Sequence, residues 1–270
     1  SLDAEGAARS VLSGQATTVP KTQTGSSEMI RHLKIARDTA VKSYSQAMVT
    51  LKTLIINAPA VLREILDQIR GEFALIRHIA AFRPGDIDTP LASAKAAMLA
   101  LVRRWLWLHE EIIAHDKELE RLVTERAPDL MASHGIAILT VAEMLIIVGE
   151  DPTHIHSQAE FAKLCGVCPI PAFSGKTHRF RLNRGGNPQA NAAFYRLAIV
   201  GIRSHEPTLA YVKKRTKDGK SKSEINRCLK RDIVREIYSQ LCVAKIAQIA
   251  TWRIQELQCR RRDILQMQQS

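Results

Sequence analysis

Two long stretches in which apolar residues recur every three or four positions limit the possible folds of this chain more than any other feature. The first spans residues 29–54 and the second residues 91–126, and each has the spacing of an amphipathic helix. A shorter helical piece is expected over residues 61–81, followed by a turn at residues 83–86. Two long helices separated by a shorter piece predict an antiparallel helical hairpin or coiled coil. Such a hairpin is more often a scaffold or a dimer contact than an active site.

The amino-acid composition also favours a helical protein. Of the 270 residues, 46% are hydrophobic but only 5% are aromatic, so the core has to be built mainly from Leu, Ile, Val and Ala. β-Sandwiches favour β-branched and aromatic residues, whereas packed helices suit this mixture better. We therefore expect a mostly α fold with one large core or two modest ones.

Changes in composition along the chain predict three parts. Residues 1–14 form a short helical stripe that ends at Gly14, and a polar linker follows. Beyond residues 127–129 come short helices separated by tight turns, with a loop-like stretch at residues 165–187. We therefore expect three domains: a terminal piece with its linker over residues 1–25, the helical hairpin or coiled coil over residues 26–128, and a helical domain with a basic loop over residues 129–270.

Two local signals mark helix starts in the last part. Asn187 followed by Pro188 is an N-cap residue followed by proline at the first helical position, and predicts a helix to about residue 204. Ser221 and Glu224 have the spacing of a capping box and predict the start of a long terminal helix.

Positive charge is concentrated in one region of the sequence. The formal net charge is +12, and residues 174–235 hold 16 lysines and arginines against four acidic residues, so the rest of the chain is neutral. A basic domain of this kind is expected of a protein that binds the phosphate backbone of nucleic acid. The alternatives are a solubilising surface or a membrane-surface patch, but the region lacks the bulky apolar face that membrane-lying helices need.

Ser174 precedes Gly175 within this basic region, and four cations follow within ten residues: Lys176, Arg179, Arg181 and Arg184. A serine surrounded by cations in a loop can act as a nucleophile toward phosphate, because the cations stabilise charge that develops on the phosphoryl oxygens. Ser-Gly is also a common turn, and the alternation of residues 179–182 fits a short β-hairpin arm that only touches DNA. Further candidate nucleic-acid-binding residues are Arg196, Lys213, Lys214, Arg215, Lys220 and Lys222.

Two other short motifs have a functional and a structural interpretation. Residues 133–137 resemble the hairpin of a helix-hairpin-helix motif, in which backbone amides contact a phosphate, but Ala137 replaces its second glycine, so packing is the alternative. Cys165 and Cys168 could bind zinc, but there is no second cysteine pair and their surroundings are apolar.

The cellular compartment is expected to be the cytoplasm. Five cysteines form an odd set without framework spacing, which fits reduced thiols. The amino terminus has neither the basic nor the apolar region of a signal peptide. The strongest apolar stretch, residues 136–149, is too short to span a bilayer, so we expect no membrane partner.

Several long strings of residues, in the same order along the chain, resemble one protein family. CGVCPIPAFSGKTHRFRLNRGGNPQANAAFYRLAI, HEPTLAYVKKRT and GKSKSEINRCLKRDIVREIY are similar to the carboxy-terminal domain of the insertion sequence 110 family of transposases, also described as bridge-RNA-guided recombinases. Upstream, LDAEGAARSVLSGQATTVPK and RHLKIARDTAVKSYSQAMVTLKTLIINAPAVLREIL resemble the segment that leads out of that family's first domain.

The resemblance implies an amino-terminal α/β domain of RuvC-like fold whose four acidic residues bind divalent metal such as Mg²⁺, then a helical coiled-coil region and a domain with a catalytic serine. That serine maps onto Ser174, and Asp3 followed by Ala4 matches one acidic position as a catalytic and metal-binding residue. The other three acids have no match in this sequence, which predicts an amino-terminally truncated protein that retains a remnant of the α/β domain and is inactive alone.

The function implied by the resemblance is DNA transposition or site-specific recombination, with Ser174 attacking a DNA backbone phosphate. The implied partners are DNA, a guide RNA and further copies of the chain. Two alternatives stay open. One is a remnant that binds nucleic acid without catalysis, and the other is a helical oligomerisation scaffold.

Overall fold

A computed structural model describes residues 2–15, 24–133, 135–175, 177–181 and 183–243 of the chain. The described residues form two compact units. We call residues 31–121 the hairpin unit, and residues 1–30 together with 122–270 the basic unit. Eleven α-helices and a single two-stranded antiparallel sheet make up most of the regular structure of the described residues, which confirms the mostly α fold.

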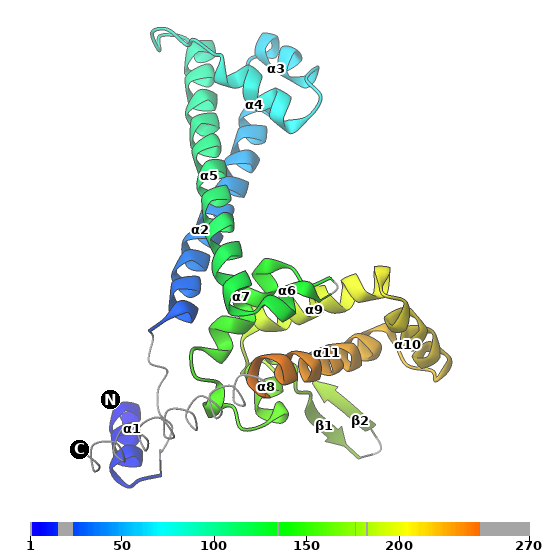
Figure 1. The fold of residues 1–270 in the computed structure, drawn as a ribbon. Coiled ribbons are helices and arrows are strands. Elements are labelled where there is room, and N and C mark those ends of the chain that lie inside the picture. The colour runs from blue at the N-terminus through cyan, green and yellow to red at the C-terminus, as the bar shows by residue number, and fades with distance from the viewer. Residues whose placement is uncertain (1, 16–23, 134, 176, 182, 244–270) are drawn as a thin grey trace, which may run out of the picture. The chain divides into compact units, whose positions relative to one another are not determined.

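The hairpin unit contains two short helices and most of two long ones (Figure 1). Residues 26–30 of the first long helix and residues 122–126 of the second belong to the basic unit. Their bounds are α2 (Ser26–Ile56), α3 (Ala60–Asp67), α4 (Glu72–Ala80) and α5 (Pro90–Arg126). The helices α2 and α5 run antiparallel: Arg37 pairs with Asp116, whereas Tyr44, further along α2, stacks on Trp105, which lies earlier in α5. The predicted helical hairpin is therefore present.

The sequence predicted one helical piece over residues 61–81, and the structure has two. Gly71 separates α3 from α4 with a φ of 92°, a conformation that L side chains rarely adopt. A helix cannot continue through that angle, so the chain turns at this point. The two short helices then contribute Leu62, Leu66, Ile76 and Ile79 to the core of the unit.

Aromatic rings form the centre of the core in the hairpin unit. Trp105 is 1% exposed, and its ring lies 4.5 Å from Tyr44 in a stacked arrangement. Phe73 of α4 meets the same indole edge-on at 5.5 Å, and His109 stacks against it from one turn further along α5. A chain with few aromatic residues has thus placed several of them around a single tryptophan.

In the basic unit, the apolar helix α7 (Ile138–Val148) is buried over most of its length. The remaining elements of the unit are α1 (Leu2–Leu12), α6 (Pro128–Ala132), a 3₁₀ turn (Pro152–His154), α8 (Gln158–Leu164), β1 (Ile170–Ser174), β2 (Thr177–Arg181), α9 (Pro188–Ser204), α10 (Glu206–Lys217), α11 (Lys222–Tyr238) and a π-helical turn (Ser239–Val243). The helix α9 packs against α7, α10 and α11, so it is the hub of this unit.

Both predicted helix caps are present. The side chain of Asn187 accepts hydrogen bonds from the backbone amides of Gln189 and Ala190, which begins α9. Ser221 and Glu224 form the reciprocal capping box that begins α11. These caps set where the two basic helices start.

A third helix start in the basic unit is stabilised from far along the chain. The carboxylate of Glu150 accepts hydrogen bonds from the Ser26 hydroxyl and, at 2.6 Å, from the backbone amide of Ser27 in the first turn of α2. Arg126 lies 2.8 Å from the other oxygen of that carboxylate. Burial acts to raise the pKa of Glu150, but these hydrogen bonds and the charge of Arg126 outweigh it and hold the pKa below its usual value.

Candidate nucleic-acid interface

The serine-bearing loop forms a β-hairpin, as the alternating residues suggested. Ser174 is the last residue of β1 and pairs with Thr177 across the turn, while Ile170 pairs with Arg181 at the other end of the hairpin. Gly175 occupies the turn with a φ of 53°, and a Cβ there would meet no atom within 4 Å, so the conformation explains the glycine. The candidate nucleophile therefore sits at the tip of the hairpin.

Part of the predicted site lies outside the described residues. Lys176 lies outside the described residues. The backbones of Ser174 and Arg179 are placed in the two strands, but their side chains are not described. Arg181 and Arg184, at the base of the hairpin, are both exposed. The prediction that these five residues act together therefore stays a prediction.

One feature of the hairpin was missed by sequence reasoning. The exposed rings of Phe173 and Phe180, one on each strand, meet edge-to-face with centroids 5.5 Å apart. The alternating sequence already placed Phe180 between two arginines. It did not show that Phe173 would be the ring beside it, because the register of the two strands decides that. The hairpin thus carries an aromatic pair beside its cations.

Below the hairpin, the loop at residues 183–187 is fixed to the end of α8 by hydrogen bonds. Asn183 donates from its side-chain amide to the carbonyl of Lys163, and the backbone amide of Asn187 donates to the carbonyl of Leu164 at 2.8 Å. A Cβ on Gly186 would overlap the backbone of Gly166, so only glycine permits this approach. The Arg-Gly-Gly sequence therefore holds the loop against the end of α8 and positions Arg184.

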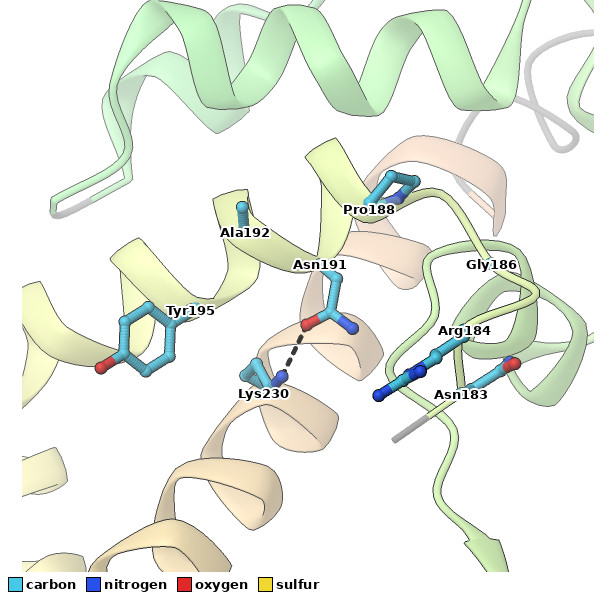
Figure 2. Close-up of a pocket in the computed structure, with 8 residues that line it drawn as sticks. All are labelled: Asn183, Arg184, Gly186, Pro188, Asn191, Ala192, Tyr195 and Lys230. Carbon is cyan, nitrogen blue, oxygen red and sulfur yellow. Dashed lines mark hydrogen bonds between the residues drawn. The ribbon is translucent and has the colours of Figure 1, made fainter. Parts of the chain in front are cut away.

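That loop forms one wall of a cleft of about 420 Å³, and α9 and α11 form the rest (Figure 2). Lys230 of α11 is 7% exposed and donates a hydrogen bond of 2.6 Å to the Asn191 side chain of α9. The Asn191 amide in turn donates to the carbonyl of Gly166 at 2.7 Å. Burial lowers the pKa of Lys230, and the nearby charge of Arg227 lowers it further.

The remaining predicted cations lie on α9, α10 and α11, except Lys220, which lies in the turn between α10 and α11. Arg196, Lys213, Lys214 and Lys222 are exposed, while Arg215 and Lys220 are half-buried. Arg215 forms an ion pair with Asp218 at 3.5 Å, and within the described part of the chain no other cation of this set does so. The other cations are therefore available to external anions.

The other sequence candidates are placed as follows. Asp3 lies in α1, and its side chain is outside the described residues. Over the residues that the structure places, no group of three or more His, Cys, Asp or Glu side chains could hold a metal ion, and Cys165 and Cys168 are reduced cysteines. A Cβ on Gly135 would lie 2.9 Å from a methyl carbon of Val200, which supports a packing role for residues 133–137, of which His134 lies outside the described residues.

Comparison with protein families places part of the chain. Residues 127–213 match the model of the Transposase IS116/IS110/IS902 family, and this stretch includes the whole β-hairpin, the Arg-Gly-Gly loop and α9. The matched stretch is less than half of the chain and ends within α10, before Lys230. None of the curated proteins that were compared matches the chain. No helix in the described ranges combines the length and apolar character needed to cross a membrane.

Proposed function

We propose that this chain acts in DNA transposition or recombination and binds the DNA backbone through the basic unit. The observation that carries the proposal is the combination of the transposase-family match over residues 127–213 with the net charge of +12 gathered in residues 174–235. Cations that lack a carboxylate partner bind phosphate oxygens strongly, and they do so with little dependence on base sequence.

In the proposed reaction, Ser174 at the hairpin tip attacks a backbone phosphorus. Its hydroxyl proton passes to a base, a new Oγ–P bond forms, and the bond between phosphorus and one bridging oxygen breaks. That oxygen leaves with a proton as a free hydroxyl on the cut strand. A hydroxyl on another strand reverses the step, so strands are exchanged without an oxidant or a reductant.

The cations around Ser174 have a defined role in this reaction. Lys176, Arg179, Arg181 and Arg184 position the strand and offset the charge that develops on the phosphoryl oxygens. A divalent metal, held by an acidic set that includes Asp3, would supply further charge compensation. A guide RNA would be held by the same backbone chemistry as DNA.

A second role is favoured by a separate observation in the hairpin unit. Ile35, Val49 and Ile56 are exposed along α2 at multiples of seven residues, and Leu106, Trp107 and Ile113 are exposed along α5. Apolar residues at this spacing suit pairing with another helix. We propose that they contact a second copy of the chain. Light scattering that shows a monomer at micromolar concentration would contradict this role.

The first experiment measures binding of a DNA duplex at a series of salt concentrations by fluorescence anisotropy. Affinity should fall steeply with salt, with a slope of about −0.9 in log K against log salt for each phosphate contact. Arg181→Gln should reduce the slope by roughly one contact, whereas Arg63→Gln, an exposed arginine of the hairpin unit, should leave it unchanged. Binding that is independent of salt would refute the proposal, and an RNA duplex in a parallel series tests the guide partner.

The second experiment tests the nucleophile. A protein that supplies further acidic residues ahead of Asp3 should form a covalent protein–DNA adduct, detected on a denaturing gel, in the presence of Mg²⁺. Ser174→Ala should abolish the adduct and leave DNA binding nearly unchanged, because the hydroxyl carries no charge. An adduct that survives this substitution would show that another residue is the nucleophile.

A further inference from the structure

The cleft between the Arg-Gly-Gly loop, α9 and α11 has the composition of an anion site. Figure 2 shows the side chains of Arg184 and Lys230 directed into it from different walls. None of the described residues that line it is acidic. Two positive groups that face the same space repel each other, and an anion between them would remove that repulsion.

Lys230 is the less expected of the two cations. A lysine is almost never buried to 7% exposure without a charged partner, and here the ammonium group donates to the neutral amide of Asn191. Asn191 is itself held by the Gly166 carbonyl, so the ammonium group is aimed by a fixed acceptor. Burying such a charge is unfavourable unless something compensates for it.

The two cations are complementary as phosphate ligands. Arg184 offers a planar fork of donors from the cleft rim, while Lys230 offers a compact charge with two remaining donors from the floor. At the other end of the cleft, the half-exposed ring of Tyr195 provides an apolar face for an adjoining sugar. This combination suits one unit of a sugar–phosphate backbone.

The cleft and Ser174 lie at opposite ends of the hairpin. Asn183 in the cleft wall follows the end of β2, where Arg181 pairs with Ile170. Ser174 is four residues further along β1, a separation of roughly 13 Å for an extended strand. A phosphate in the cleft is therefore not the phosphate that Ser174 would attack.

We propose that this cleft binds a non-scissile backbone phosphate of the DNA strand through Lys230 and Arg184, and thereby sets the position of the strand relative to the hairpin. The inference rests on the proposed function for the identity of the ligand as DNA. Lys230 is a positioning residue in this scheme, and it lies beyond the stretch that matches the transposase family.

The test compares two substitutions on the same helix that each remove one charge. Lys230→Met removes the cleft cation, and Lys222→Met removes an exposed cation outside the cleft. Affinity for a DNA duplex should fall by about tenfold in Lys230→Met, as expected for loss of a charge-assisted contact, and by clearly less in Lys222→Met. In a variant that already carries Lys230→Met, Arg184→Gln should have a smaller effect than in the wild type, because both residues hold one phosphate.

Thermal denaturation without DNA separates this role from a purely structural one. Lys230→Met should melt at the same temperature as the wild type or higher, because it removes a buried charge. A lower melting temperature combined with the affinity of Lys222→Met would overturn the proposal and leave Lys230 as a link between α9 and α11. Lys230→Gln, which keeps a donor for Asn191, replaces the methionine variant if that variant does not fold.

A test with inorganic phosphate examines the anion site without DNA, so its result does not depend on the proposed function. At constant ionic strength, replacing chloride by phosphate should raise the melting temperature of the wild type and not of Lys230→Met. If the wild type binds DNA but the two lysine variants are equivalent, the cleft proposal alone fails. If the wild type is stabilised by phosphate through Lys230 but does not bind DNA, the anion site stands and the proposed function fails.

Discussion

The hairpin unit and the basic unit are both built mainly from helices, but different interactions stabilise them. In the hairpin unit, apolar and aromatic side chains fill the space between two long helices, with Trp105 at the centre. In the basic unit, close backbone approaches and side-chain hydrogen bonds dominate around the cleft, as at Gly186, Asn187 and Asn191. A segment rich in like charges repels itself, so fixed polar contacts are needed to hold its cations in defined positions.

The largest expected effect is confined to the hairpin unit. Trp105→Ala removes the indole that Tyr44 and Phe73 contact, and should destabilise this unit by about 3–5 kcal/mol. Trp105→Phe should be milder, because it keeps a ring and removes an indole N–H that has no hydrogen-bond partner among the described residues. Hydrogen exchange should show faster opening of residues 31–121, with DNA binding by the basic unit retained. Equal loss in both units would show that they unfold together.

The second prediction compares glycines in the two units. Gly186→Ala should destabilise the basic unit by about 3 kcal/mol, since the new methyl group overlaps the backbone of Gly166. Gly71→Ala in the hairpin unit meets no neighbouring atom, so only its left-handed backbone opposes the change, at about 1 kcal/mol. Urea denaturation measures both values. Similar losses of stability at the two sites would argue against the close backbone contact between the Arg-Gly-Gly loop and the end of α8.

The third prediction concerns Glu150, whose contribution depends on pH. Glu150→Gln should destabilise the basic unit by about 1–2 kcal/mol at neutral pH, because the charged acceptor for Ser27 and the partner of Arg126 are lost. The pKa of Glu150 is depressed below its ordinary value of 4.5, so its contribution is fully present above that pH and is lost as the pH falls through the folded-state pKa. The difference between wild type and variant in thermal denaturation should therefore shrink in acid. A difference that stays constant at low pH would assign the effect to packing instead.

The long helices and the helix starts could be predicted from the sequence because their signals are local. The apolar repeat of α2 and α5 and the capping residues Asn187 and Ser221 act within one or two helical turns. The same is true of the concentrated positive charge and of the hairpin around Ser174, whose alternation was visible in the sequence. The break at Gly71 was missed because a lone glycine is tolerated in many helices.

Contacts between distant residues were decided only by the tertiary structure. Glu150 reaches the first turn of α2 across more than a hundred residues, and Lys230 meets Asn191 only because α9 and α11 pack together. In the sequence, Lys230 was one of 16 cations in residues 174–235, with nothing to separate it from its exposed neighbours. Burial distinguishes it, and burial depends on how helices pack rather than on the residues beside it in the chain. The sequence alone therefore determined the helices and the charge of this protein, whereas the fold decided which cation lies at the floor of a cleft.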